Sequence, residues 1–116
     1  MVEFAYGLTG HNEIIGNVHN PLSLEHITGG SSSGPAAAVS GSLSYGSLGS
    51  DTGGSIRFPA SCCGLVGMKP TYGLVSRYGA MPLSFSLDHI GPITRTVTDC
   101  ALLTQIISGP DENDLT

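Results

Sequence analysis

The stretch "GSDTGGSIRFPAS", from Gly49 to Ser61, places two adjacent glycines directly before a serine. Glycine has no β-carbon, so the backbone N–H groups beside Ser55 are able to turn toward a bound carbonyl oxygen. An attacking hydroxyl needs such donors, because negative charge develops on that oxygen during acyl transfer. The pattern predicts that Ser55 is a nucleophile; a glycine turn with an incidental serine is the competing interpretation. The candidate oxyanion-hole donors are the amides of Thr52, Gly53, Gly54 and Ser55.

A second serine-rich stretch, "GGSSSG" from Gly29 to Gly34, stands upstream at the start of a predicted helix. Serine side chains cap helix N-termini and Pro35 is tolerated in a first turn, so the alanine-rich run predicts a helix over residues 35–40. Ser31 precedes Ser55 by 24 residues. That separation fits a loop, a helix and a strand that return the chain to one pocket, so we expect the two serine stretches to meet.

Short strands and helices alternate along the rest of the chain. Residues 41–50 alternate small and apolar side chains, which predicts a short buried strand followed by a tight loop. A short helix is expected to begin at Pro59 and to end before Gly64. We interpret the apolar runs 64–68 and 72–79 as strands, and residues 1–28 and 86–92 as loops, the first with at most one brief strand.

The strongest helix pattern lies near the C-terminal end. Thr96 followed by Asp99 is typical of a capping box, and Gly109-Pro110 ends the helix. Apolar side chains are expected to cluster on one of its sides: Val97, Cys100, Ala101, Leu102, Leu103 and Ile106. Strands interleaved with helices predict an α/β fold.

The composition indicates the inner part of a larger protein. Charged residues make up 11% of the 116 residues, against about a quarter in an ordinary soluble domain. A flexible glycine- and serine-rich segment is the alternative, but hydrophobic residues at 40% argue against disorder. No apolar run approaches the roughly 18 residues of a membrane span, and no leader segment is recognisable.

The charged and metal-binding residue types exclude several function classes. The net charge is −5, and the four basic residues are scattered, so no direct contact with nucleic acid is expected. The four histidines show no ligand spacing, and we assign neither metal nor cofactor. Three cysteines, two of them adjacent, make a poor disulfide framework and indicate a reducing compartment, hence a cytoplasmic location.

The segment from Gly29 to Ala60 resembles the signature of the amidase signature family of serine hydrolases. "GGSSSG" is followed by "GSDTGGSIRFPA" at the family's spacing, and "GLVGMKPTYGLVSRYG" and "SLDHIGPITRTVTDCALLTQIISG" also resemble the family. The similarity runs from about Glu3 to Gly109. It implies part of a mixed β-sheet core flanked by helices, incomplete in this chain, and hydrolysis of non-peptide C–N bonds in a small-molecule amide.

The resemblance also implies the roles of individual residues. Ser55 is the acyl-accepting nucleophile, and Ser31, preceded by a cis peptide bond, is the serine that bridges it to a lysine base. The family's lysine lies upstream of the bridging serine, whereas Lys69 matches a structural stretch. Asp51 and Arg57 match family positions that hold the loop by charge-assisted hydrogen bonds. A surface ion pair is the alternative interpretation of these two residues. Ser32 is also expected to support the catalytic residues.

It follows that the chain, residues 1–116, is expected to be a fragment of a single amidase domain with its signature at 29–60. The N-terminal part with the lysine and the C-terminal part are expected to be absent. The remainder of the domain, or other subunits, would then be required, and the isolated chain would be inactive.

Two further patterns in the sequence suggest functions outside this family. Residues 30–34 also spell G-x-S-x-G, the nucleophile elbow of an α/β-hydrolase, with Ser32 as nucleophile and Asp51 or Asp88 and His89 following in order. The preceding "LEHITGG" is a weak strand, and this interpretation leaves "DTGGSIR" unexplained. A phosphate-binding loop is disfavoured because no G-x-x-x-x-G-K-[ST] occurs.

Within the family, three roles compete. An amidase acting on small free amides is favoured by His89 in "SLDHIGP" over the glutamine-hydrolysing amidase subunit of a tRNA-dependent amidotransferase. A non-catalytic scaffold or receptor is the third. Intact Ser31 and Ser55 argue for an active parent protein.

Overall fold

The computed structural model covers residues 1–116 and places a small antiparallel sheet at its centre. The strands lie in the order β1-β3-β2, so the last strand in sequence is central. Asp51 pairs with His89 at one end of the β1–β3 ladder, and Gly46 pairs with Thr94 at the other. The elements are η1 (Glu3–Ala5), α1 (Ser33–Ser40), β1 (Gly46–Asp51), α2 (Arg57–Cys62), β2 (Val66–Gly67), β3 (His89–Thr94) and α3 (Val97–Ile107).

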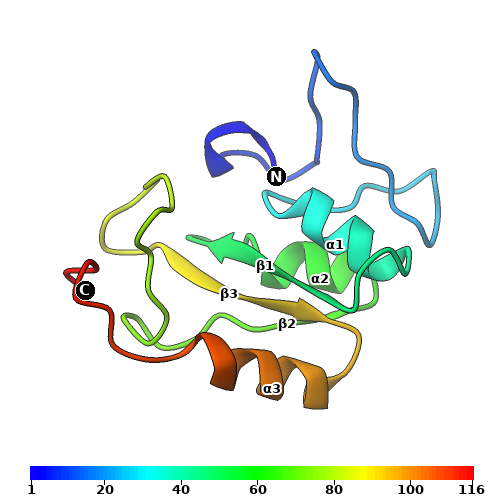
Figure 1. Ribbon diagram of the computed structural model, residues 1–116. Helices are drawn as coiled ribbons and strands as arrows, with labels where there is room; N and C mark the ends of the chain where they lie inside the picture. The colour runs from blue at the N-terminus through cyan, green and yellow to red at the C-terminus, as the bar shows by residue number, and fades with distance from the viewer.

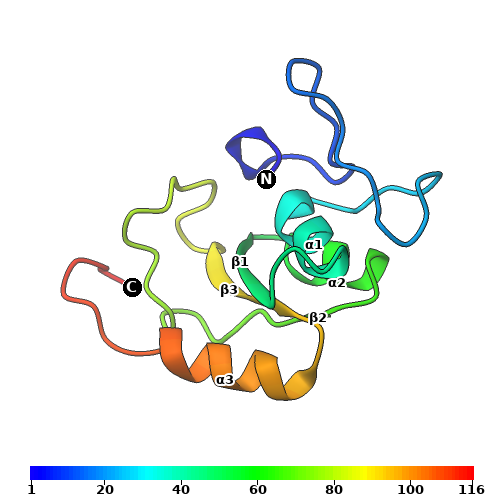
Figure 2. The same cartoon turned by 45° about the vertical axis from the view of Figure 1, so that its right-hand side comes forward.

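Helices cover both faces of this sheet. Figure 1 shows α1 and α2 on one side and α3 on the other, and Figure 2 shows the same arrangement after a turn of 45°. The N-terminal segment winds over α1, and the chain after α3 returns beside the long loop that precedes β3. The predicted α/β class, with a sheet flanked by helices, is confirmed.

The helices form close to where capping signals place them. The α1 helix spans Ser33–Ser40, so it begins two residues before the predicted start, and Ser32 at its N-cap makes no side-chain capping bond. At α3 the Thr96 hydroxyl accepts a hydrogen bond from the Asp99 N–H at 3.1 Å, which confirms the capping box. The α2 helix begins at Arg57, two residues before the predicted start, and ends before Gly64.

The prediction that residues 86–92 form a loop is wrong, because His89–Thr94 is the central strand β3. Gly91 and Pro92 resemble a turn signal but serve packing instead. A β-carbon at Gly91 would overlap the Met68 carbonyl oxygen, so the neighbouring segment approaches too closely for any side chain. Pro92 donates nothing to the sheet, yet its carbonyl accepts from the Met68 N–H at 3.1 Å.

Two other expectations are corrected. Residues 72–79 form turns and a single bridge, Val75 to Ser108, instead of a strand. On α3, Cys100 is buried, whereas Val97, Leu102 and Ile106 are exposed, so the apolar residues do not share one covered side. The N-terminal 28 residues are mostly loop, with η1 and one bridge from His19 to Ile27, as expected.

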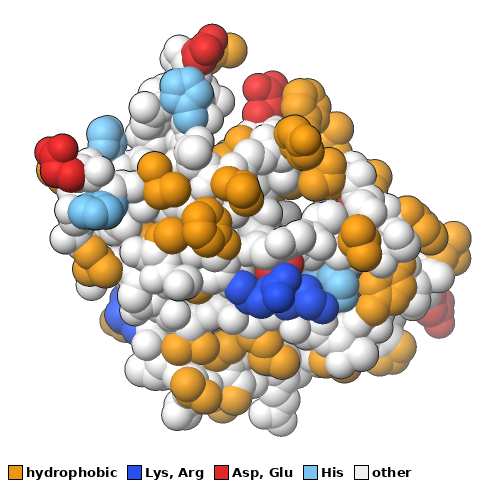
Figure 3. Space-filling view, turned by 180° about the vertical axis from the view of Figure 1, so that it is seen from behind, with side chains coloured by type: hydrophobic (Ala, Val, Ile, Leu, Met, Phe, Trp, Pro, Cys, Tyr) orange, Lys and Arg blue, Asp and Glu red, His pale blue; other side chains and the backbone are white.

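The buried core is small for a chain of this apolar content. Ile56, Ala60 and Ile93 form its cluster, with Leu65 packed against them. Only 25 of 116 residues are buried, and many large apolar side chains face outward, including Ile14, Leu43 and Tyr45 at 84% exposure or more. Figure 3 shows such side chains spread over one face. No helix combines the length and the apolar character needed to cross a membrane.

Candidate active site

The two serine-rich stretches meet, as the sequence predicts. The Ser32 N–H donates to the Ser55 carbonyl at 3.2 Å, which joins the loop before α1 to the loop between β1 and α2. The Gly30–Ser31 peptide bond is cis. Ser31 is fully buried, and Ser55 is 8% exposed. The residues that sequence analysis singled out from both motifs therefore lie in one place.

Ser32 is a structural member of this junction. Its hydroxyl accepts from the Ser50 N–H at 3.2 Å and donates to the Ser50 carbonyl at 3.3 Å, and its side chain is fully buried. The elbow alternative also needs a histidine on Ser32. His89 instead directs Nδ1 at the carbonyl oxygens of Leu87 (2.6 Å) and Asp51 (3.3 Å). This geometry disfavours Ser32 as the nucleophile.

The buried carboxylate of Asp51 organises the loop from inside. One oxygen accepts from the Gly54 N–H at 2.8 Å and the other from the Ile56 N–H at 3.2 Å. Arg57 binds the two oxygens in a fork, with its Nε at 3.0 Å from one and its Nη2 at 2.9 Å from the other. Asp51 is fully buried, whereas the Arg57 side chain is 51% exposed, so only one partner of the pair lies at the surface. These are charge-assisted bonds of the strong kind.

The ionisation of Asp51 follows from these contacts. Burial by itself would raise the pKa of Asp51, but the hydrogen bonds from Arg57 and Ile56 outweigh burial and hold the pKa below its ordinary value of 3.8. The hydrogen bond to Asp51 and the charge of Asp51 raise the pKa of the Arg57 guanidinium. The carboxylate is therefore charged at neutral pH and keeps the loop closed around it.

The geometry narrows the candidate oxyanion donors. The Gly54 amide is engaged with Asp51, so it is no longer free for a ligand. The amides of Thr52, Gly53 and Ser55 donate to no group of the chain. Gly54 has a φ of +134°, which favours glycine, and a β-carbon at Gly53 or Gly54 would meet nothing within 4 Å. Open space thus faces the backbone at these two residues.

The Ser31 hydroxyl is buried and has no hydrogen-bond partner in the chain. Leaving a buried hydroxyl unsatisfied costs about 1–3 kcal/mol, so a partner from residues beyond these 116 would be stabilising. The Ser31 carbonyl, by contrast, accepts from the Val2 N–H at 2.8 Å.

Lys69 lies against His89 and away from both serines. Its Nζ is 3.3 Å from the His89 Nε2 and 3.4 Å from the Pro70 carbonyl oxygen, and it bonds neither Ser31 nor Ser55. These contacts agree with a structural role.

Sequence reasoning missed the role of Asp88, which it considered only as a possible triad acid. The Asp88 carboxylate accepts a hydrogen bond from the Thr52 hydroxyl and two more from the N–H groups of Leu83 and Ser84. Only the adjacency of Asp88 to a strand that pairs with β1 could have indicated this contact.

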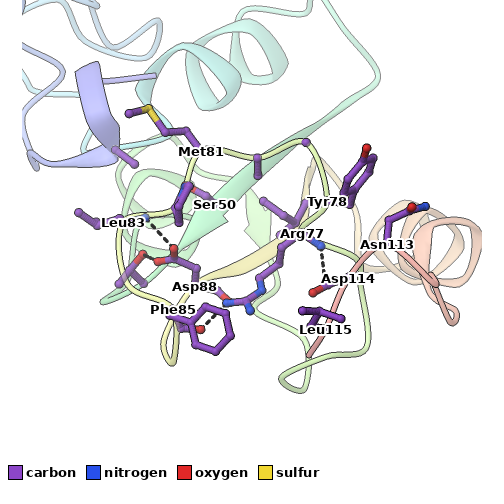
Figure 4. A pocket seen from close by; sticks show the side chains of 16 residues that line it. Ser50, Arg77, Tyr78, Met81, Leu83, Phe85, Asp88, Asn113, Asp114 and Leu115 are labelled. Carbon is purple, nitrogen blue, oxygen red and sulfur yellow. Dashed lines mark hydrogen bonds between the residues drawn. The ribbon is translucent and has the colours of Figure 1, made fainter.

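A cavity of about 310 Å³ adjoins Thr52 on the side of Asp88. Figure 4 shows Arg77, Phe85 and Asp88 around it, with Tyr78 and Met81 on the loop that closes over it. Arg77 donates to the Phe85 carbonyl at 2.6 Å and lies over the Tyr72 ring, 4.9 Å from its centre. The cavity is largely apolar near the loop and polar toward Asp88 and Arg77.

Comparison with known proteins places this geometry in a family. The family model described as Amidase matches residues 1–116. A glutamyl-tRNA(Gln) amidotransferase subunit of Thermotoga maritima is 59% identical over 114 residues, which are 98% of this chain and 24% of that protein. Its crystal structure matches with a TM-score of 0.94 at 58% identity, covering 97% of this chain and 25% of that one. Native peptide amidase from Stenotrophomonas maltophilia matches with a TM-score of 0.88 at 44% identity, covering 93% and 22%.

The chain belongs to the amidase family, whose members here are hydrolases acting on C–N bonds. The resemblance found in the sequence is thus confirmed. The chain spans about a quarter of the length of the relatives it matches.

Proposed function

We propose that this chain is the nucleophile-bearing segment of an amidase that hydrolyses C–N amide bonds through a serine acyl-enzyme. The observation that carries the proposal is the junction of the two serine stretches, where Ser32 binds the Ser55 carbonyl beside three unoccupied amides. A non-catalytic scaffold has no need for a glycine loop held by a buried carboxylate with free N–H groups around Ser55.

The reaction begins with attack of the Ser55 oxygen on the amide carbon. The Ser55 proton passes to the Ser31 oxygen while Ser31 gives its own proton to a base. The resulting oxyanion accepts hydrogen bonds from the amides of Thr52, Gly53 and Ser55. The C–N bond then breaks, the nitrogen leaves with the proton returned through Ser31, and water hydrolyses the ester along the same route. The orphaned Ser31 hydroxyl is where the base would act.

We propose that the base comes from residues outside this chain. The Lys69 Nζ contacts the His89 Nε2. By the resemblance to the family, the catalytic lysine is expected upstream of the bridging serine. We infer that residues 1–116 form part of one amidase domain, whose remaining segments supply this lysine. They would also cover the outward-facing apolar side chains. The three free cysteines fit the expected cytoplasmic location.

Two substrate classes are candidates. Relatives at 54–59% identity are named as subunits of glutamyl-tRNA(Gln) amidotransferase, which favours release of ammonia from glutamine as part of an amidotransferase. His89 in "SLDHIGP" and the likeness to peptide amidase favour an amidase acting on free amides. Ammonia release from glutamine and from propionamide by the full-length protein, with and without added amidotransferase partner subunits, distinguishes the two.

The proposal is tested by labelling with a fluorophosphonate, which reacts with activated serines. In the full-length protein we expect mass spectrometry to place the label on Ser55, and Ser55→Ala to abolish both labelling and amide hydrolysis. A label on Ser32 would favour the elbow instead. No labelling of an active enzyme would remove serine catalysis from the mechanism.

A further inference from the structure

Asp88 connects the glycine loop at Thr52 to residues 83–84 of the loop before β3, at the edge of the proposed oxyanion hole. Its Oδ1 accepts from the Thr52 hydroxyl at 2.5 Å, and its Oδ2 accepts from the N–H groups of Leu83 (2.8 Å) and Ser84 (2.9 Å). Figure 4 shows the bond to Leu83 where the loop before β3 meets the cavity. Burial would raise the pKa of Asp88, but these hydrogen bonds outweigh burial and hold the pKa below 3.8. Asp88 is therefore a charged acceptor at neutral pH.

The position of Thr52 makes this contact relevant to chemistry. Thr52 directly follows β1 and is the first residue of the glycine loop, and its own amide donates to no group of the chain. Asp51 holds the loop from inside through the Gly54 amide, and Asp88 holds it from the other side through Thr52. Between the two anchors lies Gly53, which has no side chain to restrain it.

An unrestrained pair of glycines samples many backbone conformations, and an oxyanion hole works only when its donors are already oriented. The Thr52 hydroxyl bond restrains the residue whose amide is to point at the oxyanion. The adjacent His89 strengthens this anchor, because it pairs with Asp51 at the end of the β1–β3 ladder. The Asp88–Thr52 hydrogen bond thus lies next to the paired ends of β1 and β3.

We propose that Asp88 is a positioning residue that orients the Thr52 amide as an oxyanion donor through the Thr52 hydroxyl. This inference rests on the proposed function of Ser55. It predicts that the hydroxyl of residue 52, and not merely its bulk, determines turnover.

The test compares two variants of the full-length protein. Thr52→Val keeps the shape and removes the hydroxyl, whereas Thr52→Ser keeps the hydroxyl and removes a methyl group. Loss of one oxyanion donor lowers kcat about 10²–10³-fold, so a misoriented donor is expected to lower kcat roughly 10-fold or more in Thr52→Val. KM should change by less than about threefold, because the oxyanion forms after binding. Thr52→Ser is expected to retain kcat within about threefold.

A double-mutant cycle assigns the effect to Asp88. If Asp88 acts through Thr52, then adding Asp88→Asn to Thr52→Val lowers kcat less than Asp88→Asn does in the wild-type protein. Thr96→Val is the matched control, because it removes a Thr hydroxyl bonded to Asp99 at 2.6 Å, far along the chain at the α3 cap. We expect Thr96→Val to lower the melting temperature and to leave kcat unchanged.

A second readout covers variants that fold poorly. Phenylboronic acid forms a tetrahedral anion on an active serine, and its Kd on the folded fraction should rise by the same factor by which kcat falls. The inference is overturned by a wild-type kcat in Thr52→Val, by a Thr52→Ser variant as slow as Thr52→Val, or by additive effects in the cycle. If Ser55→Ala remains active, the proposed function fails instead, and this inference fails with it.

Discussion

Ser31 and Ser55 are both buried serines, but the surroundings of their hydroxyls differ. The Ser31 hydroxyl is closed off and lacks any partner, whereas Ser55 retains 8% exposure beside open space at Gly53. A relay needs the first environment and a nucleophile needs the second. The surroundings of Ser31 therefore suit a proton relay, and those of Ser55 suit a nucleophile.

Replacing Ser31 tests the relay. In the full-length protein, Ser31→Ala is expected to lower kcat by about 10²–10⁴, the usual contribution of a positioned proton transfer. The fold should persist, because the lost hydroxyl makes no bond within the chain. Steady-state kinetics with circular dichroism checks both points. Near-normal turnover in Ser31→Ala would remove Ser31 from the mechanism. As a control, the Lys69→Ala variant should still form the acyl-enzyme.

Asp51 predicts a pH dependence of stability. Its pKa in the folded protein lies below 3.8, so its stabilisation is complete above that value and is lost as the pH falls through the lowered pKa. Asp51→Asn should lower the free energy of unfolding of the full-length protein by about 2–3 kcal/mol at pH 7, since Arg57 is half exposed and regains water. Urea unfolding should show the gap between wild type and variant shrinking below pH 3.8. A gap independent of pH would contradict the role of the carboxylate charge.

Among the helices and strands, local signals determine where α3 begins, whereas packing between strands determines β3. Thr96 and Asp99 mark the start of α3 by themselves, because both partners of the cap are three residues apart. The β3 strand has no such local mark. Gly91 and Pro92 belong to a strand only because β1 and β2 lie on either side of it.

Gly91 gives a test of this packing. A β-carbon there would overlap the Met68 carbonyl oxygen, so the backbone must shift in Gly91→Ala. Overpacking of this kind costs about 1–3 kcal/mol. Gly34→Ala, in α1, is the control, because the nearest contact of its β-carbon would be an ordinary 3.5 Å to the Met1 nitrogen. Thermal unfolding of the full-length variants should show a lowered melting temperature for Gly91→Ala only. Equal melting temperatures would show that the backbone at Met68 shifts without strain.

At the scale of the whole molecule, the apolar surface exceeds what this segment covers. The cluster of Ile56, Ala60 and Ile93 is small, while 25 large apolar side chains are exposed. The β1 and β2 strands each pair on one side only, and unpaired strand edges promote association. We therefore expect the segment to depend on further protein for its stability.

Expressing residues 1–116 alone tests this dependence. We expect no amide hydrolysis, because the proposed base for Ser31 lies outside these residues, and we expect no cooperative unfolding transition. Scattering and urea titration should show aggregation or a broad transition, with Ser55→Ala as the control for turnover. A monomer that unfolds cooperatively and hydrolyses amides through Ser55 would require a base within the chain.

The α/β class, the α1 and α3 helices, the family and the meeting of the two serine stretches could all be predicted from the residues alone. These depend on caps, on glycines and on spacing, which act within a few residues or recur as a motif. Three features became evident only from the folded chain: His89–Thr94 is the central strand, Asp51 accepts from the Gly54 amide, and Asp88 accepts from the Thr52 hydroxyl. The last contact joins residues 36 positions apart. Such contacts follow from which strands lie side by side, and no local propensity encodes that choice.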